Sequence, residues 1–140
     1  SMDKSSIKCT WVSDMAFETE IGGHKILLDA SPEVGGKNQG PRPKPLVLSA
    51  LAGCSGMDVV SILRKMKVEP SYFSMEVEGE LTEEHPKWYK KIHLIYFFKK
   101  SDNLEEDKIK KAVELSQEKY CGVNALLKRA TDVSYEIKYL

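Results

Sequence analysis

The chain has 140 residues, a length typical of one domain with its own core, and we expect a single domain over residues 1–140. Its 21 lysines and arginines balance its 21 aspartates and glutamates, so the formal net charge is zero and no basic stripe favours nucleic acid. The longest uncharged stretch, residues 45–57, is shorter than the roughly 18–20 residues of a membrane-spanning helix. We therefore expect neither nucleic acid nor a membrane as a partner.

Cysteine usage indicates the compartment. The first residues lack the basic, apolar and small-residue pattern of a secretion signal, and Ser1 ahead of Met2 is interpreted as a remnant of expression. Three cysteines are an odd number, which argues against a framework of structural disulfides. We expect a cytoplasmic protein in a reducing environment, where a pair of cysteines is more often catalytic or redox-active than structural.

The first third of the chain is predicted to be β-structure. Alternating apolar and polar residues predict strands over residues 7–12, 16–21 and 24–29. Gly22-Gly23 between the last two runs is typical of a two-residue hairpin. Residues 30–44 are rich in glycine and proline and predict a long loop, of the kind that is often functional or mobile.

A long helix is predicted to follow this loop. Pro45 suits the first turn of a helix, and the pattern continues to about Lys67, before Pro70. The first half is apolar on all sides, so we expect a central helix buried on every side. Several small residues along it favour the close approach of another helix or of a substrate: Ser49, Ala50, Ala52, Gly53, Ser55 and Gly56.

The rest of the chain is predicted to contain a hairpin, two helices and a last strand. The predicted elements are strands over residues 74–81 and 89–98, a helix capped by Ser101 or Asp102 and ending near Tyr120, a helix over residues 123–130 and a strand over residues 133–139. This order predicts an α+β fold with antiparallel sheets rather than a doubly wound parallel sheet.

Cys54 is the first candidate for chemistry. The simplest interpretation is a buried thiol that fills space in the core. However, the small neighbours Gly53 and Gly56 leave room beside the sulfur, and Ser55 and Asp58 place polar groups within about one helical turn. Buried polar side chains need partners, so this region favours a pocket.

Cys121 is the second candidate, at the junction of the two predicted helices before Gly122. A thiol at a helix N-terminus has a lowered pKa, which favours redox chemistry, although a helix-end cysteine without a role is the alternative. Cys9, in an early strand, is expected to be structural or incidental. Arg42, held between two prolines, is a candidate to stabilise a thiolate or a developing oxyanion, and a solvated loop arginine is the alternative.

The sequence contains no motif for a metal or a cofactor, and we expect neither. There is no CxxC or HExxH motif, and the histidines are not spaced as metal ligands with the cysteines. The glycine pairs do not lie between a strand and a helix in a phosphate-binding pattern.

Two segments together resemble one known family. Residues 40–66, which contain Arg42 and Cys54, resemble the core motif of OsmC-like proteins in the OsmC/Ohr superfamily. Residues 114–123, which contain Cys121, resemble the second cysteine motif of that family, and the turn at residues 83–87 fits between its two central strands. The resemblance covers nearly the whole chain. It implies an intertwined α+β homodimer with two sites at the subunit interface and a central pair of buried helices.

The resemblance also implies an activity, because catalytic members of the superfamily reduce organic hydroperoxides. By motif, Cys54 attacks the peroxide oxygen and becomes a sulfenic acid, and Cys121 condenses with it to a disulfide that an external dithiol reduces. The peroxidase members carry a carboxylate ahead of the first cysteine that pairs with an active-site arginine. Here residues 44–46 contain no acid, and the early hairpin has no arginine at residues 22–25.

Three functions follow from these observations. The first is a hydroperoxide reductase with Cys54 as nucleophile, Cys121 as resolving thiol and Arg42 as electrostatic support. The absent carboxylate favours the second, a non-catalytic protein that binds a small hydrophobic ligand in the cavity at the dimer interface. The third is a redox sensor that passes its oxidation to a partner protein.

Overall fold

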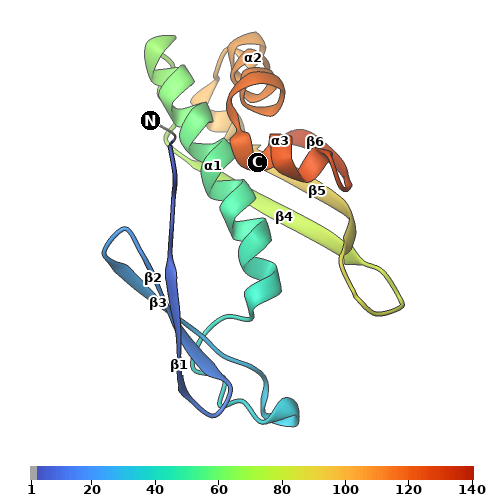
Figure 1. Ribbon diagram of the computed structural model, residues 1–140. Helices are drawn as coiled ribbons and strands as arrows, with labels where there is room; N and C mark the ends of the chain where they lie inside the picture. The colour runs from blue at the N-terminus through green and yellow to red at the C-terminus, as the bar shows by residue number, and fades with distance from the viewer. Residues whose placement is uncertain (1–2) are drawn as a thin grey trace. The chain divides into compact units, whose positions relative to one another are not determined.

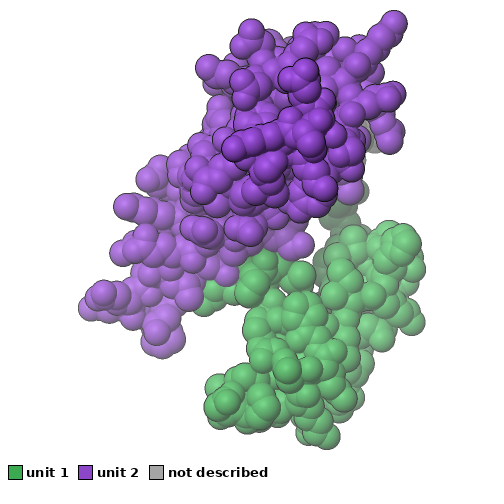
Figure 2. Space-filling model, turned by 180° about the vertical axis from the view of Figure 1, so that it is seen from behind, with its two compact units in different colours: residues 1–47 green, residues 48–140 purple. Residues whose placement is uncertain are grey.

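The computed structural model describes residues 3–140, and Ser1 and Met2 lie outside the described residues. The chain divides into two compact units, residues 1–47 and residues 48–140 (Figure 2). The helix α1 (Pro43–Lys65) continues across this boundary. The single domain expected over residues 1–140 stays a prediction.

The first unit is built on a three-stranded antiparallel sheet (Figure 1). Its strands are β1 (Lys8–Ser13), β2 (Ala16–Ile21) and β3 (His24–Leu28), in that order across the sheet, within about one residue of the predicted bounds. Gly22 and Gly23 join β2 to β3 with φ angles of 56° and 82°. Both angles are in the left-handed region that a two-residue hairpin turn requires, so the predicted hairpin is confirmed.

One buried carboxylate orders the segment after β3. Asp29 accepts hydrogen bonds from the backbone N–H groups of Ala30 at 2.7 Å, Lys37 at 3.2 Å and Gln39 at 3.1 Å. The bond from Ala30, followed by that from Gln39, lowers the pKa of Asp29 below its ordinary value. A one-turn 3-10 helix at Pro32–Val34 lies inside the same segment. The predicted loop is therefore ordered by hydrogen bonds to the carboxylate of Asp29, the residue that precedes it.

The long helix α1 begins two residues before Pro45 and ends at Lys65. Its buried residues repeat every fourth position and form one stripe: Leu51, Ser55, Val59 and Leu63. The prediction that the helix is buried on every side is therefore wrong for the single chain. The reason is that only one face of α1 packs against the rest of the second unit, while Met57 on another face is 76% exposed.

The helix α1 is also longer than the uncharged stretch of residues 45–57, from which the sequence predicted no membrane-spanning segment. An 18-residue window of α1 has a mean hydropathy of 1.9, so its length and composition match those of a membrane-spanning helix. In residues 3–140 no other helix meets these criteria. A core helix of a globular protein can meet them as well, and 22% of this window is buried inside the protein.

The second unit contains a mixed sheet in the order β4-β5-β6 (Figure 1). The strands β4 (Phe73–Leu81) and β5 (Tyr89–Phe98) are antiparallel, as predicted. The strand β6 (Asp132–Tyr139) lies parallel to β5, with Ile92 beside Val133, so the expectation of purely antiparallel sheets is corrected. Parallel strands need a long crossover connection, and the helices between β5 and β6 form it. The predicted α+β class is confirmed.

This crossover consists of α2 (Glu106–Leu115), a π-helical turn over Ser116–Tyr120, and α3 (Gly122–Lys128). The predicted cap at Ser101 or Asp102 is wrong, because both residues lie in a 3-10 turn that ends before Asn103, whose φ is 48°. The Asp102 carboxylate instead accepts a hydrogen bond from the backbone N–H of Ser71 at 2.7 Å.

The core of the second unit lies between the sheet and the helices. Its fully buried side chains come mainly from one face each of α1, β5 and α2: Leu51, Val59, Leu63, Ile92, Leu94, Tyr96, Phe98, Ile109, Ala112 and Val113. Alternate residues of β5 point into this core, as the period of a strand requires. The site described below lies at the edge of this core, where α1 meets the turn between α2 and α3.

Candidate thiol site

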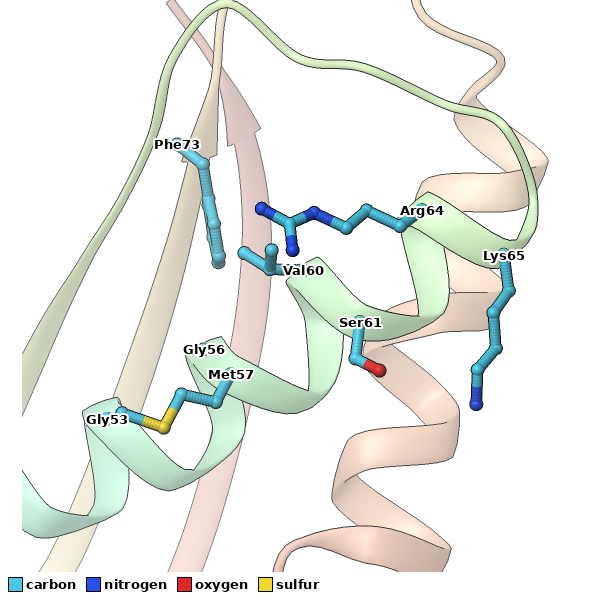
Figure 3. A pocket seen from close by; sticks show the side chains of 8 residues that line it. All are labelled: Gly53, Gly56, Met57, Val60, Ser61, Arg64, Lys65 and Phe73. Carbon is cyan, nitrogen blue, oxygen red and sulfur yellow. The ribbon is translucent and has the colours of Figure 1, made fainter.

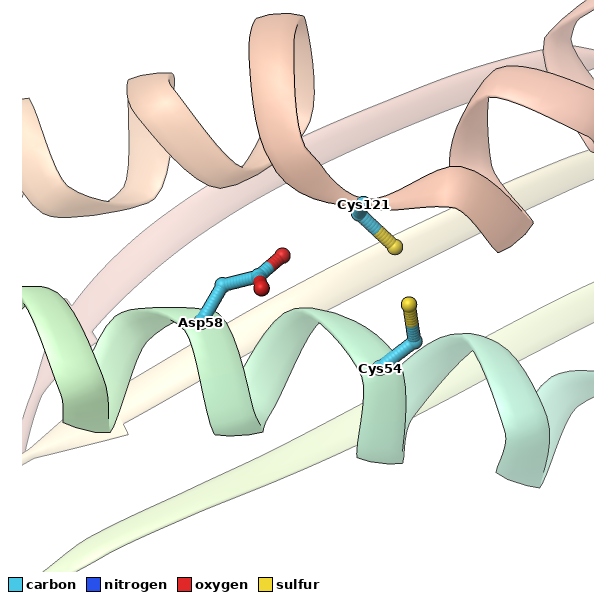
Figure 4. Close-up of side chains that lie close together, drawn as sticks. All are labelled: Cys54, Asp58 and Cys121. Carbon is cyan, nitrogen blue, oxygen red and sulfur yellow. The ribbon is translucent and has the colours of Figure 1, made fainter.

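Two thiols and one carboxylate meet in the second unit. Cys54 and Asp58 are four residues apart on α1, so their side chains lie on the same face, one turn apart. Cys121 follows the π-helical turn and comes from the other side (Figure 4). The two Sγ atoms and one carboxylate oxygen of Asp58 all lie within 4.8 Å of one another. Folding therefore brings together the two cysteines that the sequence paired and adds Asp58.

The two thiols differ in exposure. Cys54 is half-buried, Cys121 is 3% exposed, and both are free thiols. The pKa of Cys121 is raised to about 11, mainly because burial disfavours the charged thiolate. This value includes a lowering by the hydrogen bond from the backbone N–H of Asn124 to the Cys121 Sγ, at 3.4 Å, and smaller raising contributions from the neighbouring Cys54 and Asp58. The predicted lowering of the Cys121 pKa is therefore wrong, because burial outweighs the N–H group at the start of α3.

A break in the helical path positions Cys121. Its backbone N–H donates to the carbonyl oxygen of Ser116 at 2.9 Å, which closes the π-helical turn. Cys121 then leaves the helical conformation, with φ −77° and ψ 100°, and becomes the N-cap of α3. This change of direction at the predicted junction aims the Cys121 side chain at α1 (Figure 4).

Ser116 orients the carboxylate of the site. Its Oγ donates a hydrogen bond to Asp58 Oδ2 at 3.0 Å and lies 2.8 Å from the Oγ of Ser55. Both serines are fully buried. The hydroxyl groups thus connect the Asp58 turn of α1 to the π-helical turn that precedes Cys121.

A buried polar network continues beneath the thiols. The Tyr96 hydroxyl lies 2.6 Å from the Oγ of Ser55 and accepts a hydrogen bond from Gln117 Nε2 at 2.7 Å. The Asn124 Nδ2 donates to Gln117 Oε1 at 2.7 Å. Desolvation raises the pKa of Tyr96, so it remains protonated at neutral pH. The network ties β5, α1 and α3 together and so sets the spacing of the two cysteines.

Sequence reasoning missed part of this arrangement. Asp58 was considered only as a polar neighbour of Cys54, although its spacing of four residues along one helix places both on one face. Tyr96, Gln117 and Asn124 carry no signal in their spacing, because their contacts form only when β5 and the helices pack together.

Arg42 makes its hydrogen bonds inside the first unit. Its Nη1 donates to Asn38 Oδ1 at 2.7 Å and to the carbonyl oxygen of Gly40 at 3.2 Å. Its positive charge also contributes to the lowered pKa values of Asp29 and Glu33. The predicted support of a thiolate by Arg42 stays a prediction. Cys9 is exposed on β1.

Comparisons with known proteins identify the family of this chain. The chain matches the OsmC-like protein family over residues 36–136. It is 35% identical over 130 residues to the protein YhfA of Escherichia coli K12, which covers 91% of this chain and 93% of that protein.

Solved structures agree with this match. A hypothetical protein from Aquifex aeolicus VF5 superimposes with a TM-score of 0.82 and 31% identity, over 99% of both chains. An organic hydroperoxide resistance protein from Legionella pneumophila shares the fold with a TM-score of 0.71 and 19% identity, over 99% of this chain and 98% of that one. The chain that holds the Cys54–Asp58–Cys121 arrangement therefore belongs to the OsmC-like protein family.

Proposed function

We propose that the protein is a thiol-dependent peroxidase that reduces organic hydroperoxides. The observation that carries this proposal is the pair of free thiols, of which one is half-buried and one is buried, with sulfur atoms within 4.8 Å. An accessible thiol beside a shielded one is the arrangement expected of a peroxide-reacting cysteine and its resolving partner. Membership of a family that shares its fold with a protein named for hydroperoxide resistance supports the same activity.

The proposed reaction has three steps. The Cys54 thiol first loses its proton, and the thiolate attacks the terminal oxygen of the hydroperoxide and takes its OH group as the O–O bond breaks, so that Cys54 becomes a sulfenic acid. The departing alkoxide takes up the proton that Cys54 released and leaves as the alcohol. The Cys121 sulfur then attacks the Cys54 sulfur, the S–O bond breaks, and water leaves with the Cys121 proton. An external dithiol finally reduces the Cys54–Cys121 disulfide to two thiols and is itself oxidised to a disulfide.

Asp58 has a place in the second step. Cys121 is protonated at neutral pH because its pKa is raised to about 11, so its proton must be removed as its sulfur attacks. The Asp58 carboxylate lies within 4.8 Å of both sulfur atoms and is held by Ser116. We propose that the Asp58 carboxylate accepts the proton from Cys121 and passes it to the hydroxyl group that leaves Cys54 as water. Arg42 is proposed to stabilise the charge that develops on the peroxide oxygen.

We further propose a homodimer formed through the exposed face of α1. This face carries Gly53, Met57 and Val60 beside a groove of about 720 Å³ that Phe73 of β4 also lines (Figure 3). Apart from the adjoining residues and backbone of α1 itself, no heavy atom lies within 4 Å of the position that a Cβ at Gly53 would occupy, so another helix has room to approach closely. Sedimentation of Met57→Glu is expected to show a monomer. Leu126→Glu, a matched change at an exposed apolar residue of α3, is expected to leave the dimer intact.

The proposed setting is the cytoplasm, with a small-molecule hydroperoxide and an external dithiol as reactants. Neither nucleic acid nor a membrane is part of the proposal. The test is intact-protein mass spectrometry after one equivalent of cumene hydroperoxide, with the remaining free thiols blocked by alkylation. We expect the loss of two protons, mapped to a bond between Cys54 and Cys121.

Three variants make this test specific. Cys54→Ser is expected to lose peroxide consumption. Cys121→Ser is expected to consume one equivalent of peroxide and stop at the Cys54 sulfenic acid, and Cys9→Ser is expected to behave as the parent. Consumption of peroxide by Cys54→Ser at the parental rate contradicts the proposal.

The groove on α1 favours one alternative function, the binding of a small hydrophobic ligand without catalysis. Its lining is largely apolar, with Arg64 and Lys65 at one end. In that case both thiols remain reduced after the peroxide treatment, and native mass spectrometry of the purified protein shows a retained ligand. In the variant Met57→Glu, which places a charge in the groove, less of this ligand is then retained.

A further inference from the structure

We propose that the reduced Cys54–Asp58–Cys121 cluster binds a thiophilic divalent cation of the Zn²⁺ class. The cluster offers two sulfur atoms and one carboxylate oxygen, all within 4.8 Å of one another. Among residues 3–140 it is the one group of three or more His, Cys, Asp or Glu side chains close enough to share an ion. The proposal concerns the reduced thiols and does not depend on peroxidase activity.

The spacing of these atoms suits a tetrahedral ion. Zinc binds thiolate sulfur at about 2.3 Å and carboxylate oxygen at about 2.0–2.2 Å, which places the ligand atoms of a tetrahedral site roughly 3.5–3.8 Å apart. Each pair of donor atoms, at most 4.8 Å apart, therefore needs to approach by about 1.3 Å at most. Cys54 and Asp58 lie on adjacent turns of α1 and face Cys121 across a narrow gap, so small side-chain rotations achieve this (Figure 4).

Two buried groups already orient the donors. The Ser116 Oγ donates to Asp58 Oδ2 at 3.0 Å, and the backbone N–H of Asn124 donates to the Cys121 Sγ at 3.4 Å. Such bonds to ligating atoms hold a metal site in shape, and their removal typically weakens metal binding about 10- to 100-fold. The Asp58 carboxylate and the Cys121 sulfur are therefore already held in place before an ion binds.

The ligand set leaves one coordination position free. Three protein ligands with an open fourth position are typical of exchangeable or catalytic zinc, whereas structural zinc sites carry four protein ligands. Because Cys54 and Asp58 are half-buried, the ion has a route from solvent. If the proposed peroxidase reaction holds, a bound cation occupies both thiolates and inhibits it, and conversion of the two thiolates to a disulfide releases the ion.

The test is an anaerobic titration of the reduced full-length protein with Co²⁺, followed by competition with Zn²⁺. Charge-transfer absorption from sulfur to cobalt reports thiolate ligands. We expect one Co²⁺ per chain with this absorption, displaced by one Zn²⁺. Cys54→Ser and Cys121→Ser are each expected to weaken binding by at least about 100-fold and Asp58→Asn by at least about 10-fold, since each removes a direct ligand. Cys9→Ser is the control and is expected to bind as the parent.

Several results overturn the proposal: no charge-transfer absorption, binding that persists unchanged in Cys54→Ser, or binding that disappears in Cys9→Ser. Circular dichroism checks that the cysteine variants are folded, and Asp58→Asn decides the outcome if they are not. The two proposals are separable. Tight Co²⁺ binding without peroxide turnover leaves the cation site standing, and turnover without Co²⁺ binding removes only the cation site.

Discussion

The Ser116 hydroxyl donates a hydrogen bond to Asp58 Oδ2 over 3.0 Å and connects the carboxylate beside the two thiols to the turn that carries Cys121. Asp58 stands four residues from Cys54 on α1, and Ser116 stands five residues before Cys121. One contact between two helices therefore sets the position of both sulfur atoms relative to a negative charge. The electrostatics of the thiol pair depend on it.

Removal of the Asp58 charge is expected to make Cys121 more acidic. A carboxylate near a thiol disfavours the thiolate, and Asp58 is one of the groups that raise the pKa of Cys121. In Asp58→Asn we expect the apparent pKa of Cys121 to fall below about 11 and its alkylation at mildly alkaline pH to become several-fold faster.

Mass-spectrometric alkylation rates as a function of pH, in a Cys9→Ser background, measure this effect. Glu118→Gln removes a charge from the π-helical turn before Cys121, and Glu118 is not among the groups that shift the pKa of this thiol. This variant is therefore expected to leave the pH profile of Cys121 alkylation unchanged. An identical profile in Asp58→Asn and in the parent refutes the assignment.

Burial of the Cys121 thiol predicts a loss of stability at alkaline pH. The pKa of this thiol is raised from 9.0 to about 11 by folding. Between these values the folded protein keeps a proton that the unfolded chain has released, so the free energy of unfolding falls as pH rises from 9 to 11. The effect is on the order of 2 kcal/mol, because one unit corresponds to about 1.4 kcal/mol.

Urea unfolding of the reduced protein across this pH range tests the prediction. Cys121→Ser is expected to flatten the pH dependence, while Cys9→Ser, which alters an exposed thiol, keeps it. A slope that is equal in Cys121→Ser and the parent counts against the raised pKa.

Loss of the Tyr96 hydroxyl is expected to destabilise the second unit. In Tyr96→Phe, the buried Nε2 of Gln117 loses the hydroxyl to which it donates at 2.7 Å, whereas Ser55 loses its contact with Tyr96 at 2.6 Å but keeps the Ser116 hydroxyl at 2.8 Å. A buried polar group left without a partner costs about 1–3 kcal/mol, and we expect a decrease of that size in the free energy of unfolding.

Tyr135→Phe provides the matched control for Tyr96→Phe. Tyr135 is 36% exposed, and surface changes of this kind usually remain within about 0.5 kcal/mol. Urea unfolding of both variants at neutral pH gives the comparison. Equal stabilities for the two variants contradict a structural role for the network beneath the thiols.

Protonation or replacement of Asp29 is expected to loosen the segment between β3 and α1. Because folding lowers the pKa of Asp29, its stabilising contribution is present above 3.8 and is lost as pH falls through the lower folded value. In Asp29→Asn the amides of Lys37 and Gln39 lose a charged acceptor.

Hydrogen exchange followed by nuclear magnetic resonance measures this change at neutral pH. We expect the Lys37 and Gln39 amides to exchange faster in Asp29→Asn and the amides of β2 to be unaffected. Glu20→Gln, on an exposed strand position, is the control. Unchanged protection of both amides in Asp29→Asn contradicts the prediction.

Local sequence patterns determined most of the secondary structure. The bounds of β2 and β5 match their predicted ranges, and the paired left-handed glycines follow from the two-residue hairpin they form. These features depend on residues near in sequence, so periodicity and turn chemistry are enough to predict them. The cap of α2 was not predictable in this way, because the Asp102 carboxylate bonds to the backbone of Ser71, far away in the chain.

The sequence by itself determined that Cys54 and Cys121 are the unusual thiols, because small and polar residues surround Cys54 and Cys121 lies at the junction of two predicted helices. Only the tertiary structure decided their chemistry. It buried Cys121 and raised its pKa, where the helix-end position alone predicted the opposite. It also placed Asp58 within 4.8 Å of both sulfur atoms. The pKa of a thiol depends on desolvation and on charges brought near by packing, and neither can be predicted from the residues next to it in the sequence.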